Sequence, residues 1–304
     1  MGITSSTILR KAGRITYDGG VFYSGDAAIN VRLNETRFAI KADMFAKIQE
    51  RPQDRIYEIK CPLVGEWEHL ALLWPHGSTA IGASIFSNET LKINTRDGEV
   101  YTFSNVAVTT SPTIRAIVGQ TLIGEVTFTA ILKDGADPGD SDAYVTIGSE
   151  SYGSDAFSVA AIKTPIWANA WGASPFDAFK TSGGITLDFP LTFEPVKVDG
   201  LGTVNMTLVE KAATAKGTPV GVTMAQVLTA INANTAMGSA PTQNDLIITG
   251  TGVHLQLYNA MLRDPQFNWH SKTDLIGELT WMACQDFTTN VADPLYYIGT
   301  EAPA

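Results

Sequence analysis

The chain has 304 residues, which is enough for one large domain or two domains of about 150 residues each. Hydrophobic residues make up 44% of it, so a sizeable core can form and a chain disordered throughout is excluded. The net charge of −10 argues against sequence-specific binding of DNA or RNA and against attachment to an anionic membrane surface.

The start of the chain and its cysteines favour a protein of a reducing compartment. The first residues form no apolar core of a signal peptide, and no run of about 18 apolar residues occurs, so we expect no membrane insertion. Cys61 and Cys284 lie in opposite halves of the chain, without metal-like spacing. We therefore expect no disulfide framework.

The first predicted elements are an arm and a helix. Residues 41–62 show no clear periodicity, and we interpret them as a long loop or arm, which in a compact domain usually has a function. Residues 66–74 place apolar side chains at helical spacing, from Trp67 to Trp74. Pro75 and Gly77 then end the predicted helix.

Strands are expected after this helix. Residues 91–103 alternate with period two on both sides of Asp97-Gly98, which predicts a hairpin with a tight turn. Residues 114–132 are rich in β-branched and aromatic residues and predict further strands. The stretch 134–158 is polar, acidic and rich in glycine, as a linker is. We therefore divide the chain near residue 155, into domains 1–155 and 156–304.

The second half predicts the same order of elements. Residues 185–193 are typical of a strand, and residues 197–220 again lack clear periodicity and are interpreted as an arm. A helix is expected over 223–234, with Thr223 as its cap and Gln226 completing a capping box. Residues 246–260 predict a hairpin whose second strand turns Val253, Leu255 and Leu257 to one face and His254 and Gln256 to the other.

The two halves resemble each other in sequence. Residues 121–128 read TLIGEVTF and residues 274–281 read DLIGELTW, which places Gly124 and Gly277 153 positions apart. Further pairs follow in the same order, at an offset that drifts to 156 towards the N-terminus. They include Pro112 with Pro265, Asn105 with Asn259, Lys41 with Lys197 and Asp43 with Asp199. Such order predicts a duplication, hence a mainly β chain with two tandem copies of a β-sandwich or barrel, each with one packed helix.

Two groups of residues could hold a metal. The carboxylates of Asp134, Asp137, Asp140 and Asp142 could coordinate calcium, but their spacing does not match an EF-hand loop. Cys61, His69 and His76 could be metal ligands, but the short paired spacings of structural zinc sites are missing. We favour a solvated linker for the first group, and a buried thiol with two ordinary histidines for the second.

The other candidates for chemistry also have simpler interpretations. His254 and His270 could serve a hydrolase triad, but no Gly-x-Ser-x-Gly motif accompanies them, and no phosphate-binding loop occurs. Gly124-Glu125 and Gly277-Glu278 could be paired carboxylates, but each pair belongs to its own strand, where glycine allows close backbone approach and glutamate faces outwards. We expect no catalytic, cofactor-binding or metal site, and no enzyme.

Tryptophans collect in the second half. The four are Trp167, Trp171, Trp269 and Trp281. They could stack on sugars or bases, but anchoring a core or an interface is the commoner role of tryptophan.

The segments VAVTTSPTIRAIVGQTLIGEVTFTAI and TDLIGELTWMAC resemble segments of the tail tube proteins of long, non-contractile phage tails. The resemblance implies a β-sandwich with one helix and a long arm, six of which close a ring, and rings that stack into a tube. With two units in one chain, three chains would form a trimeric ring with pseudo-sixfold symmetry. The arms and residues 1–14 would bridge the rings, and the acidic lumen would let DNA slide without specific binding.

The same resemblance implies a place in the virion tail after assembly in the bacterial cytoplasm, with self-contacts and tail terminator, tape-measure and distal tail proteins as partners. Two alternatives stay open beside an enzyme, which we rank last. One is another phage structural protein, such as a baseplate, terminator or decoration protein, and the other is a carbohydrate-binding β-sandwich. The ring number and the lumen-facing residues also stay open.

Overall fold

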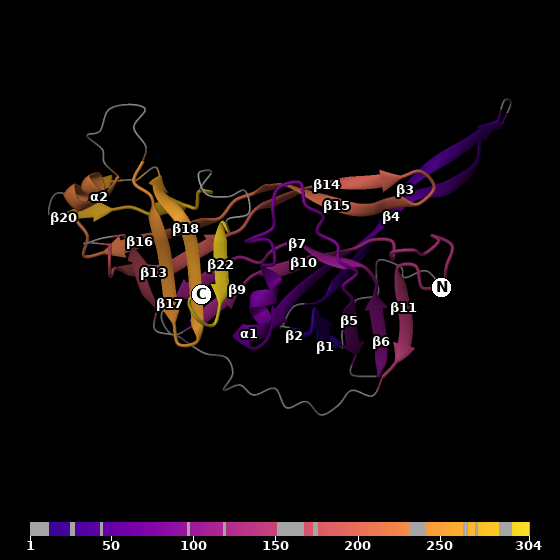
Figure 1. The fold of residues 1–304 in the computed structure, drawn as a ribbon, viewed down its shortest axis with the longest axis horizontal. Coiled ribbons are helices and arrows are strands. Elements are labelled where there is room, and N and C mark those ends of the chain that lie inside the picture. The colour runs from indigo at the N-terminus through magenta and orange to yellow at the C-terminus, as the bar shows by residue number, and fades with distance from the viewer. Residues whose placement is uncertain are drawn as a thin grey trace.

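The computed structural model is mainly β (Figure 1). It describes residues 12–24, 28–42, 45–95, 98–117, 120–150, 167–172, 176–231, 241–263, 265, 267–270, 273–285 and 294–303. Most strands belong to two nine-stranded sheets with antiparallel pairing, and two further hairpins stand outside these sheets. The predicted mainly β fold class is therefore confirmed, while the two tandem copies of one fold stay a prediction.

The first sheet has the strand order β11-β6-β5-β1-β2-β4-β10-β7. The ninth strand, β3, pairs with β4 over residues 45–60. Its strands are β1 (Ala12–Tyr17), β2 (Gly20–Ser24), β3 (Asn30–Ala42), β4 (Phe45–Val64), β5 (Leu91–Thr95), β6 (Glu99–Phe103), β7 (Val106–Thr110), β10 (Glu125–Ala130) and β11 (Val145–Ser149).

The second sheet has the order β12-β17-β18-β21-β16-β13-β8-β9, with β22 paired to β18. Its strands are β8 (Ile114–Ile117), β9 (Gln120–Ile123), β12 (Ala168–Trp171), β13 (Lys180–Asp188), β16 (Thr214–Val220), β17 (Asn244–Gly250), β18 (Val253–Arg263), β21 (Leu279–Met282) and β22 (Tyr296–Gly299). The two separate hairpins are β14 (Leu191–Val198) with β15 (Gly202–Lys211), and β19 (Phe267–His270) with β20 (Thr273–Ile276).

Both predicted helices are present and short. The first is α1 (Trp67–Leu70), continued by the 3-10 helix η1 (Ala71–Leu73), and it ends before Pro75 as expected. The second is α2 (Met224–Ala230). Its capping box is confirmed, because the Thr223 hydroxyl accepts a bond from the Gln226 backbone N–H and the Gln226 side chain accepts one from the Thr223 N–H. The part of the predicted helix beyond Ile231 lies outside the described residues up to 240.

The interpretation of 41–62 and 197–220 as irregular arms was wrong about their conformation. Residues 45–64 form the long strand β4, and residues 197–220 lie mostly in β14, β15 and β16. The pairing of these strands shifts register at Thr36/Arg37, Thr192/Phe193 and Val196/Lys197. Each shift inserts a residue and moves later side chains to the other face, which hides the period-two pattern in the sequence.

The predicted linker 134–158 is also partly wrong. Residues 145–149 form β11, which pairs antiparallel with β6 along its whole length, from Val145 opposite Phe103 to Ser149 opposite Glu99. The stretch 134–158 is rich in aspartate, serine and glycine, but β11 lies at a sheet edge, and its residues from Thr146 to Ser149 are exposed. An exposed edge strand needs few apolar residues, so composition alone could not distinguish it from a linker.

Strand pairings recur between the two halves with the same register. Asn30 lies opposite Lys60 in the β3–β4 pair, and Thr186 lies opposite Lys216 in the β13–β16 pair, 156 positions later on both sides. Pairings at matching positions, with offsets between 153 and 156, also occur in β10–β4 and β21–β16, in β5–β6 and β17–β18, and in β8–β9 and β19–β20. Asn105 and Asn259, matched in the sequence, both have positive φ, of 48° and 46°.

The hydrophobic core runs through both halves without a break. It includes Phe22 and Phe128 in the first half and Trp171 and Trp281 in the second. Aromatic rings connect the halves: Trp74 meets Phe189 at 6.1 Å between ring centroids, and Phe189 meets Tyr296 at 4.7 Å. The division into domains 1–155 and 156–304 stays a prediction, but any boundary there crosses a shared core.

Candidate assembly interface

One contact between the two halves is a strand pairing. The β8–β9 hairpin belongs to the first half by sequence, yet β8 pairs antiparallel with β13 of the second half. The paired residues are Ile114 with Leu187, Arg115 with Thr186, and Ala116 with Ile185. Because main-chain bonds of this kind need no particular side chain, the hairpin extends the second sheet as an added strand would.

Gly184 makes this approach possible. It lies in a bulge of β13, with φ of +87°, and a Cβ added there would lie 2.2 Å from the carbonyl oxygen of Ala116. Neighbouring Gly183 has a similar φ of +81° but open space around its missing Cβ. A glycine is therefore needed at position 184 to let β8 approach. At position 183 it is favoured only because the backbone φ is positive.

Two indole hydrogen bonds hold the hairpin from outside, and a third hydrogen bond lies within it. Trp74 donates its indole N–H to the carbonyl of Pro112 at 2.9 Å, and Trp167 donates to the carbonyl of Ile117 at 3.0 Å. At the other end, the Gly124 N–H donates to the Thr113 carbonyl at 2.8 Å, and a Cβ on Gly124 would lie 2.7 Å from the Thr113 hydroxyl oxygen. Of these bonds only that of Trp167 crosses between the halves, while Trp74 anchors the hairpin to its own half.

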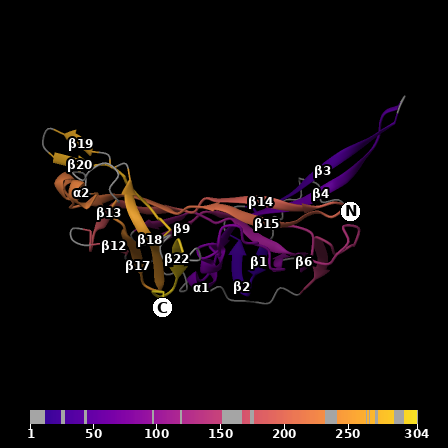
Figure 2. The same cartoon turned by 45° about the horizontal axis from the view of Figure 1, so that its top comes forward.

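Conversely, the β14–β15 hairpin belongs to the second half by sequence and lies across the first half (Figure 2). Backbone bonds join β15 to the segment before β5: Gly82 N–H to Leu208 O at 2.7 Å, Leu208 N–H to Ala83 O at 3.0 Å and Ile85 N–H to Met206 O at 3.1 Å. The Lys211 ammonium donates to the carbonyls of Gly77 and Thr79, both at 2.9 Å. Each half thus places one hairpin on the other.

The tip of the β14–β15 hairpin is held by Asp54 of β4. The buried carboxylate accepts bonds from the Thr203 backbone N–H at 2.9 Å and hydroxyl at 2.8 Å, and pairs with the Lys197 ammonium at 2.8 Å. Burial by itself would raise the pKa of Asp54, but the bonds from Lys197 and Thr203 and the charge of Lys197 together hold the pKa below its ordinary value. Gly202, with φ of +79°, lets the backbone approach the carboxylate.

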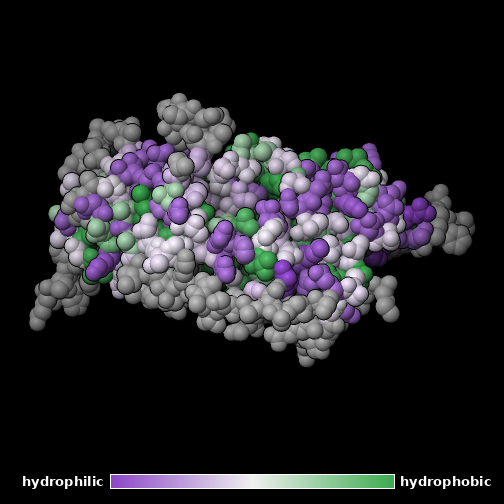
Figure 3. All heavy atoms as spheres, turned by 60° about the horizontal axis from the view of Figure 1, so that its bottom comes forward, coloured by the Kyte–Doolittle hydropathy of each residue, from purple (hydrophilic) through white to green (hydrophobic). Residues whose placement is uncertain are grey.

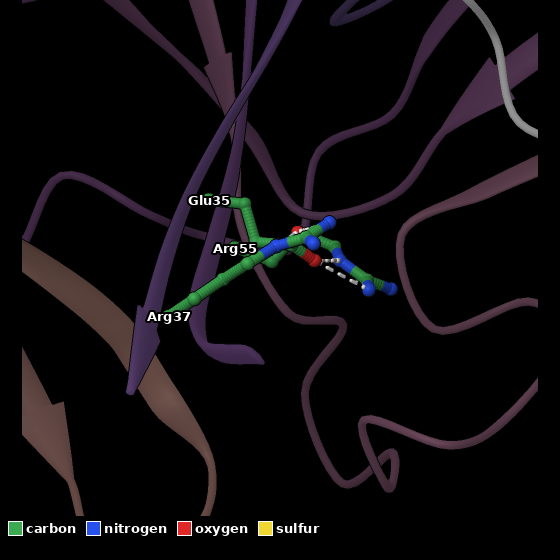
Figure 4. Close-up of polar contacts among 3 residues, drawn as sticks. All are labelled: Glu35, Arg37 and Arg55. Carbon is green, nitrogen blue, oxygen red and sulfur yellow. Dashed lines mark hydrogen bonds and ion pairs between the residues drawn. The ribbon is translucent and has the colours of Figure 1, made fainter. Parts of the chain in front are cut away.

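Beyond Asp54, the β3–β4 hairpin projects as an arm past the body of the first half (Figures 1 and 2). Glu35 and Arg55 lie opposite each other across the two strands, and the guanidinium of Arg55 donates to the Glu35 carboxylate at 2.8 and 3.2 Å. Arg37 pairs with the same carboxylate (Figure 4). The hydrogen bond from Arg55 is the main reason why the pKa of Glu35 is lowered. Burial would raise this pKa, and the bond from Arg37 lowers it further.

The acidic residues proposed for calcium do not share a site. Asp142 pairs with Lys133 at 2.7 Å, and Asp134 accepts a bond from Asn88 at 3.4 Å. Asp137 accepts from the Gly139 N–H and Asp140 from the Asp137 N–H, both at 3.0 Å, as turns commonly do. The four carboxylates therefore stabilise a turn region before β11.

The proposed metal ligands Cys61, His69 and His76 likewise have separate surroundings. Burial raises the pKa of the Cys61 thiol and lowers that of the buried His76, whose Nε2 lies 2.7 Å from the Val108 carbonyl. His69 lies edge-on to Phe22. Among the described residues, no group of three or more His, Cys, Asp or Glu side chains could hold a metal ion. Cys61 and Cys284 are both free thiols.

The predicted polar face of β18 is buried rather than solvated. His254 and Gln256 are both about 8% exposed, because β22 covers this strand and places Tyr297 against His254 at 6.0 Å between ring centroids. The Gln256 amide oxygen accepts a bond from His254 Nε2, 3.2 Å away, and the Gln256 amide nitrogen donates to Asp245 at 2.7 Å. This satisfied polar chain has a structural role. The side chain of His270 lies outside the described residues.

The remaining candidates follow the simpler interpretations. Glu125, the first residue of β10, and Glu278, directly before β21, are both exposed and lie apart from each other in the chain's strands. Trp171 and Trp281 are buried in the core, where Trp171 donates to the Ala260 carbonyl at 2.8 Å. The side chain of Trp269 lies outside the described residues.

Sequence reasoning missed the residues that fix the joints, above all Asp54, Thr203 and Gly184. The matched pair Lys41 and Lys197 served only as evidence of the repeat, although Lys197 is the residue that pairs with Asp54. Pairing partners lie far apart in the chain, as Asp54 and Thr203 do, and a single sequence carries no record of such distances.

The fold and these joints define the class as a mainly β protein that uses sheet edges and hairpins for contact between its two halves. No protein-family model matches the chain, and no curated protein matches it. Among the described residues, no helix is long and apolar enough to cross a membrane.

Proposed function

We propose that the chain is a structural subunit that carries one β unit twice and joins copies of itself head to tail into rings. The observation that carries the proposal is the β8–β13 pairing, in which a hairpin of one half completes the sheet of the other. The recurring registers of the two halves support the duplication. A unit that binds its neighbour in this way binds the next one by the same surfaces.

The kind of assembly that fits best is a phage tail tube, with three chains and six units in each ring. The projecting β3–β4 arm supports this proposal, because an arm beyond the body of the subunit can reach a neighbour. The net charge of −10 suits a conduit along which DNA slides without sticking. In that role the protein would belong to the virion tail, beside the terminator, tape-measure and distal tail proteins, and would have no catalytic task.

Light scattering of the purified chain over a wide range of concentration tests the proposal. We expect a mass of three chains or a multiple of it, with larger particles as rings stack. Fluorescence anisotropy with a labelled DNA duplex at low salt is the companion measurement, and we expect no specific binding. A mass of one chain at every concentration would contradict the proposal.

A further inference from the structure

The strand β3 has an open edge at the base of the arm. Among the described strands β3 pairs with β4 alone, whereas β13, at the matching place in the second sheet, pairs with β16 on one side and β8 on the other. Asn30 opposite Lys60 corresponds to Thr186 opposite Lys216. The edge of β3 that corresponds to the β8 side of β13 is therefore free to accept a strand.

The hairpin β19–β20 corresponds to β8–β9. Phe267 lies opposite Ile276 as Ile114 lies opposite Ile123, with 153 positions between the members of each match. Among the described strands β19 pairs with β20 alone, whereas β8 also pairs with β13. Figures 1 and 2 place β20 and the β3–β4 arm at opposite ends of the molecule, so these two edges cannot meet within one chain.

We propose that β19 of one copy pairs antiparallel with β3 of a second copy, in the register that β8 uses on β13. The pairs would be Phe267 with Val31, Asn268 with Asn30, and Trp269 with Ile29. The inference rests on the proposed function and deepens it, because it names the surface and the partner. The contact is heterologous, with different surfaces on the two copies, so repetition closes a ring or extends a filament.

A second contact follows from the arms. Within the chain, Lys197 of the β14–β15 arm pairs with Asp54 of β4. The matching positions are Lys41 on the β3–β4 arm and Glu210 on β15, and both residues are exposed. When β19 docks on β3, the arm that continues from β3 extends over the copy that supplies β19. We then expect an ion pair between Lys41 of the copy that supplies β3 and Glu210 of the copy that supplies β19. This pair stabilises the contact less than a buried pair would, because water screens the charges.

One difference limits the paired length. Ala28 stands where Gly184 stands in the second half, and Gly184 needs its missing Cβ to let the Ala116 carbonyl approach. The proposed pairing therefore begins at Ile29 and does not extend towards the N-terminus.

Cysteine cross-linking of the full chain tests the register. In a Cys61→Ala, Cys284→Ser background, the pair Asn30→Cys with Asn268→Cys places thiols on directly opposed residues, whose separation suits a disulfide. Arg115→Cys with Thr186→Cys is the matched control, because it sits at the same register positions of the joint within one chain. Val31→Cys with Asn268→Cys is the mismatch, because neighbouring residues of a strand point to opposite faces.

Non-reducing gels and light scattering are read on the same samples. We expect the first pair to link copies covalently, the control pair to close within single chains, and the mismatch to stay mostly unlinked. Assembly without linkage through residues 30 and 268, while the control pair closes, would overturn the inferred register and leave the proposed function standing. A chain that stays monomeric would overturn both.

Discussion

At the scale of single residues, the joints depend on a few groups that combine polarity with close packing. Asp54 is the clearest, because it is a buried carboxylate that accepts two bonds from Thr203 and faces one cation, Lys197. Its neighbour Gly202 would bring a Cβ to 2.9 Å from the carboxylate oxygen, so the site needs both an acid and a bare backbone. Such a site fixes the position of a hairpin more than it adds stability.

Replacing Asp54 by asparagine should cost about 1–3 kcal/mol of unfolding free energy at pH 7, as the loss of charge-assisted hydrogen bonds does. The pKa of Asp54 is held below its ordinary value, so its contribution is present above about pH 4 and is lost as the pH falls through the lower pKa of the folded state. Urea unfolding at pH 7 and at pH 3 should show the difference between wild type and variant shrinking in acid. Asp199→Asn, at an exposed carboxylate of the same arm, is the control, and a pH-independent difference would contradict the assignment.

At the scale of elements, the contacts between the halves are made by hairpins, where the sequence had predicted irregular arms. The β14–β15 hairpin crosses onto the first half and the β8–β9 hairpin crosses onto the second, so the two halves exchange one element each. The exposed side chains of the β3–β4 and β14–β15 hairpins are mixed, with Leu33, Phe38, Val196, Val198 and Val209 among charged residues. Over the face in Figure 3, hydrophobic and hydrophilic residues are likewise interspersed.

The β8–β13 pairing should fail when Gly184 gains a side chain. Gly184→Ala sets a Cβ against the Ala116 carbonyl, whereas Gly183→Ala pays only the backbone cost of a positive φ. We expect Gly184→Ala to lose about 1–3 kcal/mol more than Gly183→Ala, which is the scale of local strain at such sites. Urea unfolding gives the two values, and amide exchange at residues 114–117 locates the loss. Equal losses would show that β8 does not press on Gly184.

The elements that the sequence predicted well are those governed by local rules. The capping box of α2 and the 91–103 hairpin depend on residues within a few positions of each other, and both are present. The arms were misread because bulges interrupt their alternation, and β11 because an exposed edge strand has the composition of a linker. Of the candidate interface, the repeat pointed to matching positions such as Lys41 and Lys197, but crossing of the hairpins between halves depends on long-range packing that no local pattern encodes.

At the scale of the whole molecule, one continuous core joins two halves, and in each half one described strand lacks a pairing partner on one side. Among the described strands, β3 of the first half has one unpaired edge, and the β19–β20 hairpin of the second half joins neither large sheet and lies at the far end of the molecule. An open edge of this kind favours pairing with another chain. In the account proposed here, the copies remove each other's open edges, and an acidic chain lines a passage that repels DNA.

Electron microscopy of the purified chain at a concentration where it associates tests the central claim most directly. The account predicts closed rings of three chains, with six similar β units around the axis and β19 of each chain beside β3 of the next. Particles that remain single chains, or rings in which β3 and β19 both face solvent, would contradict it.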